Sequence, residues 1–290
     1  MITIKPYAGW NEVLVLGNPA VELFITLEAG PRILRFALKD GRNIFKEYTE
    51  QLGKSGEKTW MIRGGHRLWV APELDSTYHL DNHKVAWTKL SELSVRLQPE
   101  PETSNGWAKE IDITLSPDKS EAQVVHRLKS LKDQPAPVAL WALSVMAPGG
   151  TAIIPQPPLG SHPKDLLPNR RVVLWPYTEV ADPRYTWNTK NMLLRQDAQK
   201  GPTKIGLLHQ QGKVGYALDG LLFTKTIPFQ SGAEYPDFGV NLELFSNEEM
   251  LEVESLAPLG LLKKGQVAEH VENWTLQKIG ATDWSSASLH

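Results

Sequence analysis

The stretch Met250-Leu-Glu-Val-Glu-Ser-Leu256 carries the pattern that decides the fold class. Apolar and polar residues alternate along it, so an extended chain places Glu252 and Glu254 on one face and Leu251 and Val253 on the other. Such alternation is typical of an antiparallel strand with one covered face. Two carboxylates this close raise each other's pKa, which suits a general base near neutral pH. The alternative is a solvent-facing strand with two ordinary glutamates.

Similar segments recur along the chain, separated by turn signals such as Lys39-Asp40-Gly41. The predicted strands are Glu12–Gly17, Val21–Leu27, Arg32–Leu38, Val85–Leu97, Trp107–Leu115, Val124–Leu131, Ile205–His209, Val214–Leu218, Leu221–Phe229, Gly239–Phe245 and Val267–Leu276. Val138–Met146 is almost entirely apolar, which predicts a strand covered on both faces. The sequence contains no long amphipathic helix, fixed-period repeat or clear linker. We therefore expect residues 1–290 to form one all-β domain, a large antiparallel β-sandwich.

Charge and composition exclude several classes of protein. The 31 basic and 33 acidic residues are finely mixed and give a net charge of −2, which argues against a nucleic-acid or anionic-membrane partner. The absence of cysteine excludes disulfides, thiolate catalysis and sulfur-ligated metals. The N-terminus shows no signal peptide, and the longest apolar stretch, Val138–Ala147, is about half a membrane span. We expect a soluble cytoplasmic protein.

Tryptophan is unusually frequent in this chain. There are 10 tryptophans, against 7 tyrosines and 7 phenylalanines. Indole offers a broad apolar face and one polar N–H, which suits the C–H face of a sugar ring. Most of the tryptophans are expected to be core or strand residues, and about two or three to face a ligand.

The densest polar stretch is Arg63-Gly-Gly-His-Arg-Leu-Trp-Val-Ala-Pro-Glu73. Adjacent glycines let the backbone turn sharply or approach a ligand closely. Because buried charges are costly unless paired, we interpret the stretch as the rim or floor of a site that uses Arg63, His66, Arg67 and Trp69. The alternative is a turn leading into a strand, with solvated arginines.

A second polar segment, Thr77–Lys84, contains His79, Asp81, Asn82 and His83. In an extended chain the two histidines and the aspartate share a face, at a spacing that would suit a metal. A metal site needs a further ligand that cannot be placed, so we predict no metal and no cofactor. His79, Asp81 and Asn82 are candidate substrate contacts, and His83 is a candidate catalytic residue.

Polar residues from other strands complete the predicted site. Lys225 lies inside the apolar segment Leu221–Phe229, where a charge needs a partner or a cavity. Tyr235, Asp237 and Glu243 form another polar run that enters a strand. Alone, each of these residues is commonly structural; together with the glutamates they form the polar constellation that a sugar site on a sheet face requires. The sequence has neither a Gly-x-Ser-x-Gly elbow nor a phosphate-binding Gly-x-x-x-x-Gly-Lys loop.

The C-terminal part of the chain carries a family resemblance. Leu251-Glu-Val-Glu254 is followed by Leu261-Leu-Lys-Lys-Gly265 and Trp274-Thr-Leu276. This order of a Leu-Glu strand, a leucine-rich turn and a last strand with an aromatic residue resembles the galactose mutarotase-like (aldose 1-epimerase) superfamily. Ile62-Arg-Gly-Gly65 is similar to a run in its hexose-6-phosphate mutarotases. The resemblance implies that Glu252, the glutamate of the Leu-Glu pair, is the general base.

Three further runs resemble a bacterial family of unknown function that is assigned to the same superfamily. They are Gly64-Gly-His-Arg-Leu-Trp69, Leu167-Pro-Asn-Arg-Arg-Val-Val-Leu-Trp-Pro-Tyr177 and Ala233-Glu-Tyr-Pro-Asp237, and this likeness spans most of the chain. It implies a β-supersandwich whose ligand lies on the concave face of a sheet. It does not imply one activity.

One departure from the mutarotase pattern bears on the reaction. The mutarotases have a histidine acid after a central apolar strand, whereas Met146–Gln156 of this chain contains no histidine. The proton donor must therefore be His66, His79 or His83, or the mutarotase reaction is absent. We choose His66 as the candidate acid.

The sequence thus predicts a carbohydrate-active protein, an aldose mutarotase or epimerase-like isomerase. Glu252 would take the proton of the anomeric hydroxyl while His66 protonates the ring oxygen. Arg63, Arg67 and Lys225, with Asp81 and Asp237, would hold hydroxyls or a carboxylate. Two alternatives stay open: a non-catalytic sugar-binding protein, and a lyase or glycoside hydrolase that uses Glu252 and Glu254 on uronic-acid sugars.

Overall fold

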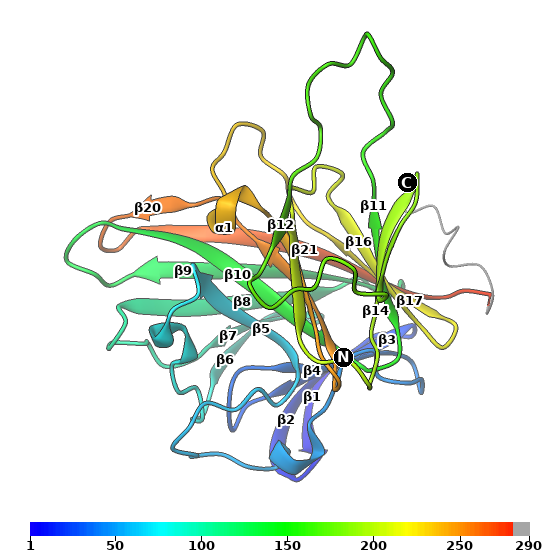
Figure 1. Cartoon of the computed structure of the whole chain (residues 1–290). Helices are drawn as coiled ribbons and strands as arrows, with labels where there is room; N and C mark the ends of the chain where they lie inside the picture. The colour runs from blue at the N-terminus through cyan, green and yellow to red at the C-terminus, as the bar shows by residue number, and fades with distance from the viewer. Residues whose placement is uncertain (281–290) are drawn as a thin grey trace.

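The structure is a computed structural model that describes residues 1–280. Its regular secondary structure consists almost entirely of strands in two large antiparallel sheets (Figure 1). The prediction of an all-β antiparallel sandwich is therefore confirmed. Three short helices, η1 (Thr49–Gln51), η2 (Asp75–Tyr78) and α1 (Pro236–Gly239), lie in the connections.

The first sheet has eleven strands within the described residues. Their spatial order is β1 (Ile2–Tyr7), β2 (Trp10–Gly17), β3 (Val21–Thr26), β4 (Ile33–Leu38), β5 (Gly65–Ala71), β10 (Ala136–Met146), β19 (Leu251–Leu256), β18 (Leu242–Ser246), β15 (Thr203–Leu207) and β12 (Val172–Leu174), with β20 (Gly260–Leu262) paired to the start of β10. Strands β5, β10 and β19, which are far apart in the sequence, are neighbours at its centre.

The second sheet has ten strands in the same part of the chain. Their order is β13 (Tyr185–Trp187), β14 (Asn191–Arg195), β11 (Thr151–Pro155), β16 (Lys213–Leu218), β17 (Leu221–Thr226), β21 (Val267–Lys278), β9 (Glu121–Ser130), β8 (Trp107–Leu115), β7 (Ser94–Gln98) and β6 (Ala86–Ser91). The single strand predicted over Val85–Leu97 is wrong: it is the hairpin β6–β7. Leu93 lies inside the two-residue turn, and its alternation with Val95 and Leu97 runs from the turn into β7, so the period alone does not reveal the turn.

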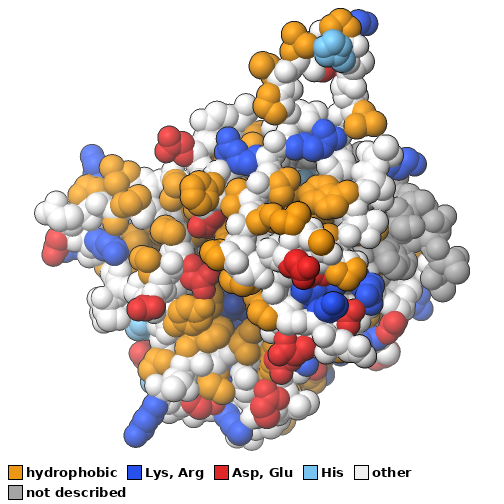
Figure 2. Space-filling view, in the orientation of Figure 1, with side chains coloured by type: hydrophobic (Ala, Val, Ile, Leu, Met, Phe, Trp, Pro, Cys, Tyr) orange, Lys and Arg blue, Asp and Glu red, His pale blue; other side chains and the backbone are white. Residues whose placement is uncertain are grey.

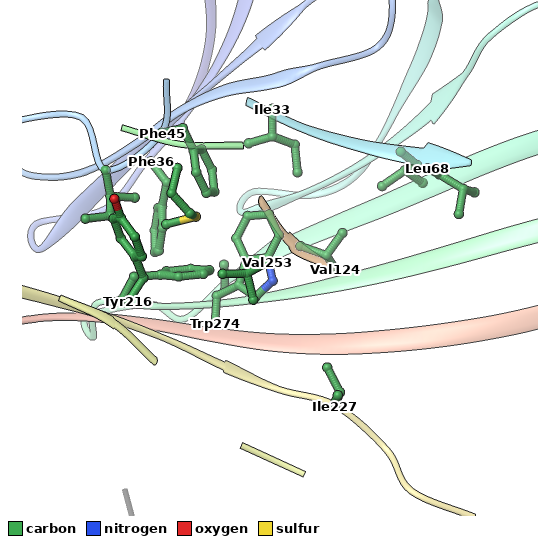
Figure 3. Close-up of a cluster of buried hydrophobic side chains, with 14 of the residues drawn as sticks. Ile33, Phe36, Phe45, Leu68, Val124, Tyr216, Ile227, Val253 and Trp274 are labelled. Atoms are coloured by element: carbon green, nitrogen blue, oxygen red, sulfur yellow. The ribbon is translucent and has the colours of Figure 1, made fainter. Parts of the chain in front are cut away.

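The main hydrophobic core lies between the two sheets. Phe36 and Phe45 pack against Trp274 of β21 (Figure 3), and their ring centroids lie 5.8 and 5.6 Å from that of Trp274. Val253 of β19 enters the same cluster. Because side chains alternate along a strand, its neighbours Glu252 and Glu254 must face away from this core. The first sheet therefore presents a second, polar face.

The loop between β11 and β12 projects far from the body of the molecule (Figure 1). Hydrophobic side chains gather on this projection (Figure 2), including the exposed Leu159, Leu166 and Leu167. Among residues 1–280, no helix has the length and apolar composition needed to cross a membrane.

Candidate functional site

The outward face of the first sheet gathers charged side chains from four strands. Arg67 of β5, Glu254 of β19 and Glu243 of β18 lie in one row across the sheet, with Leu143 of β10 between the first two. Glu252 lies two residues before Glu254 on β19. Lys204 of β15 lies beside the carboxylates of Glu243 and Glu254. We call Arg67, Lys204, Glu243, Glu252 and Glu254 the carboxylate face.

Arg67 holds Glu252 in place on this face. Its Nη1 donates a hydrogen bond to Glu252 Oε1 at 3.0 Å, and both side chains are buried. The guanidinium also lies over the rings of Trp69, at 4.2 Å, and Trp60, at 5.3 Å. Cation–π contacts of this kind orient an arginine and stabilise its charge. The pair thus holds the Glu252 carboxylate in a fixed position beside an aromatic wall.

Lys204 is shared by two other carboxyl groups. Its Nζ lies 2.7 Å from Glu243 Oε2 and 3.0 Å from Glu254 Oε2, and Trp141 Nε1 donates to the latter oxygen at 2.8 Å. Burial raises the pKa of both glutamates, and Lys204 opposes the rise. The charge of Glu254 raises the pKa of Glu243 further, and the charge of Glu252 raises that of Glu254. The pKa of Lys204 is raised because the two carboxylates outweigh its own burial.

Aromatic rings form one side of the site. Trp69 packs against Trp60, Tyr78 and Trp141 with ring centroids 4.9 to 5.5 Å apart. A cavity of about 660 Å³ opens beside Arg67 and Tyr78, and neither the three tryptophans nor the glutamates of the carboxylate face line it. Its size is within the range of pockets that hold small ligands.

Four buried atoms at the site have neither a hydrogen-bond partner nor an ion-pair partner among the described residues. They are Trp60 Nε1, Arg67 Nε, Glu243 Oε1 and Glu254 Oε1. An unsatisfied buried polar atom costs about 1–3 kcal/mol, so such atoms rarely persist without a use. Two donors and two acceptors on one face are the groups that a hydroxylated ligand can satisfy.

The double glycine at the start of β5 is required by close packing. Gly64 and Gly65 have φ of +95° and +67°, and a Cβ on either residue would lie 2.0 or 2.4 Å from a backbone oxygen of Lys46 or Ile33. Only glycine fits there. The stretch from Arg63 thus continues as a central strand, as the alternative interpretation expected, but its arginines are buried and paired and not solvated.

Arg63, Asp81 and Asn82 hold the connection before β5 and the segment after it together. Arg63, which is fully buried, donates to Glu57 Oε2 at 2.6 Å and to Asn82 Oδ1 at 3.0 Å. Asp81 pairs in the same way with Arg32, at 2.5 Å. These candidates for substrate binding are engaged in protein contacts that shape the loops beside the site.

His66 and Lys225 lie on the opposite side of the first sheet, between the two sheets, and do not reach the carboxylate face. His66 is adjacent to Arg67 in β5, so its side chain points into the core, where Nε2 lies 2.7 Å from His126 Nε2. Lys225 Nζ pairs with Glu272 Oε1 at 2.9 Å, and both groups have no exposure. Burial lowers the pKa of His66 far below its ordinary value, which keeps the ring neutral.

Ligand atoms of His66, His126 and Glu272 lie within 4.8 Å of one another, a spacing compatible with a metal ion. These groups already satisfy each other, however. His66 Nδ1 contacts Ser144 Oγ at 2.9 Å, His126 Nδ1 contacts a backbone carbonyl at 3.0 Å, and the ammonium of Lys225 neutralises Glu272. The cluster is complete as a hydrogen-bond network, and we assign no metal to it.

The remaining candidates lie around the periphery. His79 and His83 line the 660 Å³ cavity, and His79 Nδ1 contacts Ser104 Oγ at 3.2 Å. Tyr235 is buried and accepts a backbone hydrogen bond from Gln230. Asp237 has a φ of +50°, and its charge contributes to the raised pKa of Glu243.

Sequence reasoning missed Lys204, Trp141 and Trp60. Lys204 could have been found, because Ile205 and Leu207 occupy the inward positions of the same strand and leave Lys204 on the polar face. Trp141 was hidden in the continuous apolar run of β10, in which alternation cannot distinguish the two faces. Trp60 lies outside any strand and gave no signal.

No protein-family model matches the sequence, and no curated protein is detectably similar to it. Several solved structures share its architecture. A galactose mutarotase-like protein from Lactobacillus casei ATCC 334 is 14% identical, with 91% of this chain and 100% of that chain covered and a TM-score of 0.61. The Slr1438 protein from Synechocystis sp. PCC 6803 is 11% identical, with 96% and 100% covered and a TM-score of 0.64.

A galactose mutarotase related enzyme from Lactobacillus acidophilus is 9% identical, with 93% of this chain and 98% of that chain covered and a TM-score of 0.55. At these identities the likeness concerns the fold, as expected for a scaffold that can carry different functions. The chain has the fold of the galactose mutarotase-like proteins.

Proposed function

We propose that the protein is a carbohydrate-active isomerase of the aldose mutarotase or epimerase type, with Glu252 as its general base. The observation that carries the proposal is the pairing of Glu252 with Arg67 on the outward sheet face, beside the Trp60–Trp69–Trp141 wall. A sugar whose C–H face lies on this wall would present its hydroxyls to the carboxylates. The names of the similar structures support the same class of reaction.

In this reaction Glu252 takes the proton of the anomeric hydroxyl while an acid protonates the ring oxygen. The C1–O5 bond then breaks, rotation about C1–C2 exposes the other face of the aldehyde, and closure gives the opposite anomer. Arg67 fixes the carboxylate for the transfer through its hydrogen bond of 3.0 Å. Positioned acid–base groups each contribute about 10²–10⁴-fold to such reactions.

A second candidate is a non-catalytic sugar-binding protein. It is favoured by the lack of a histidine on the carboxylate face as defined from residues 1–280, since His66 lies in the core. The third candidate, an enzyme of uronic-acid sugars, has less support. Arg67 and Lys204 are already paired with glutamates, which leaves them poorly suited to neutralise a substrate carboxylate.

The experiment is a polarimetric screen of freshly dissolved α-anomers of neutral hexoses, pentoses and amino sugars with the wild-type protein. Acceleration of the approach to anomeric equilibrium supports the isomerase. Saturable binding of a sugar by calorimetry without any acceleration would favour the binding protein. Release of unsaturated or reducing sugar from uronic-acid oligosaccharides would overturn both.

A further inference from the structure

The carboxylate face lacks the expected histidine acid but holds an unusual carboxyl pair. We propose that Glu243 and Glu254 share one proton, and that Glu254 donates it to the ring oxygen of the sugar while Glu252 acts as base. The inference rests on the proposed function and names the second catalytic group of the same site.

The first argument is the charge of the pair. Glu243 and Glu254 are directly opposite each other in the register of β18 and β19, and one oxygen of each contacts the same Lys204 ammonium. Both side chains are at most 1% exposed. Two carboxylates and one ammonium would leave an excess negative charge out of water, and one shared proton removes it. Neighbouring carboxyls in other enzymes share a proton for this reason.

The second argument is the hydrogen bonding of Glu254. Its Oε2 accepts from both Trp141 Nε1 and Lys204 Nζ, at 2.8 and 3.0 Å. Its Oε1 is buried and has no partner among the described residues. A proton on Oε1 gives this atom a donor that a ligand oxygen can accept. The unpartnered oxygen of Glu243, Oε1, offers the sugar a second polar contact.

The third argument is distance. Glu252 and Glu254 are two residues apart on one face of β19, which separates them by roughly 7 Å. Two groups that each form a hydrogen bond of about 2.6–3.2 Å can bracket the O1–C1–O5 unit of a sugar at this separation. The acid and the base then come from one rigid strand.

The charged and titratable groups around Glu243 and Glu254 shift the pKa of the pair in both directions. Lys204 favours ionisation, whereas Glu252 on β19 and Asp237 in α1 oppose it, and Tyr177 and Lys225 also interact with Glu254. Burial, the largest contribution, raises the pKa of both members. The groups titrate together, so the proton belongs to the pair.

The step balances without a cofactor. Glu252 carboxylate removes the proton from O1, the C1–O5 electron pair moves to O5, and the O–H bond of Glu254 breaks as O5 takes its proton. A C1=O1 double bond forms from the electrons of the O1–H bond. Ring closure returns the proton from O5 to Glu254 and the proton from Glu252 to O1.

The test compares the pH dependence of anomer exchange in wild type and Glu254→Gln. Glutamine keeps the size of the side chain but cannot donate a carboxyl proton. We expect kcat/KM to fall about 10²–10⁴-fold and the alkaline limb of the profile to disappear. Glu269→Gln, on the solvent-facing side of β21, is the matched control and should leave the profile unchanged.

A second measurement does not depend on activity. The infrared spectrum of the wild type at pH 7 should contain the carbonyl band of a buried protonated carboxyl, and the band should be lost in Glu254→Gln. If Glu254→Gln does not fold, the pH dependence of anomer exchange is measured on Lys204→Met in its place. Removing the ammonium raises the pKa of the pair, so the alkaline limb should move to higher pH.

The outcomes separate the two proposals. Wild-type protein that exchanges anomers while Glu254→Gln keeps its rate and profile overturns the proton donor alone. Absence of the infrared band, or no shift of the limb in Lys204→Met, also overturns it. Wild-type protein that accelerates no anomer exchange overturns the proposed function, and the donor role with it.

Discussion

The substitution Lys225→Met tests whether this lysine belongs to the core instead of the sugar site. Lys225 Nζ lies 2.9 Å from Glu272 Oε1 and 3.1 Å from the Val253 carbonyl, with no exposure of either side chain. Methionine fills a similar volume without a charge. The change should destabilise the fold and leave the carboxylate face intact.

The magnitude follows from the partner that is left behind. Glu272 keeps its hydrogen bonds from Ser255 and Trp274 but loses its countercharge. Removing one member of a buried ion pair costs about 3–5 kcal/mol. For 290 residues the unfolding entropy is roughly 0.6 kcal/mol/K, so Tm should fall by about 5–8 °C. Lys225→Met/Glu272→Gln should recover most of the loss, because no unpaired charge remains.

The assays are urea denaturation followed by tryptophan fluorescence, and sugar binding or anomer exchange per folded molecule. Lys84→Met, on an exposed side chain paired with Glu12, is the control and should change stability by less than about 1 kcal/mol. Unchanged stability of Lys225→Met combined with lost sugar binding would refute the reasoning, since it would return Lys225 to the site.

Three further predictions concern acid stability, the aromatic wall and substrate charge. Burial lowers the pKa of His66 well below its usual range and that of His270 to about 3, so both stay neutral when folded. Their contribution to stability is complete above about pH 6.5 and is lost as pH falls, because the unfolded chain then binds protons that the folded state does not. In urea denaturation the free energy of unfolding at pH 5.0 should be lower than at pH 7.5 by about 4 kcal/mol from these two groups. Equal free energies of unfolding at the two pH values would contradict the buried neutral histidine network. Trp69→Ala removes the ring 4.2 Å from Arg67 and should weaken sugar binding about tenfold in calorimetry, whereas an unchanged Kd would place the sugar elsewhere. Hexose phosphates and uronic acids should bind at least about tenfold more weakly than the neutral hexose, because Arg67 and Lys204 are already paired; tighter binding of the anions in the same assay would contradict this.

The fold class could be predicted from alternation because a period of two is a local property. Glu252 and Glu254 illustrate this: the alternation predicted that they share one face of the strand, and in the structure Leu251 and Val253 enter the core while the two glutamates face away from it. Their burial was not predictable from the strand alone. Their partners come from other strands of the sheet: Lys204 and Glu243 lie beside Glu254, and Arg67 pairs with Glu252.

The position of His66 in the core was not predicted, because the stretch from Arg63 was interpreted as the rim or floor of a site and the strand of the alternative interpretation was given no register. Once β5 is known, the same period of two separates His66 from Arg67 and sends them to opposite faces. Lys225 is different. Its partner Glu272 lies on β21, and no local pattern reveals which strand will pair with β17. Long-range pairing of strands is the information that a single sequence lacked.

The most direct measurement is exchange NMR of the anomeric protons at equilibrium, with the sugar that wild-type protein turns over fastest. Wild-type protein should give exchange cross-peaks between the α and β anomers, and Glu252→Gln should reduce the exchange rate about 10²-fold or more. Arg67 remains in both proteins, so the aromatic wall and its cation are unchanged. Exchange in Glu252→Gln at the wild-type rate would contradict the assignment of Glu252 as the base.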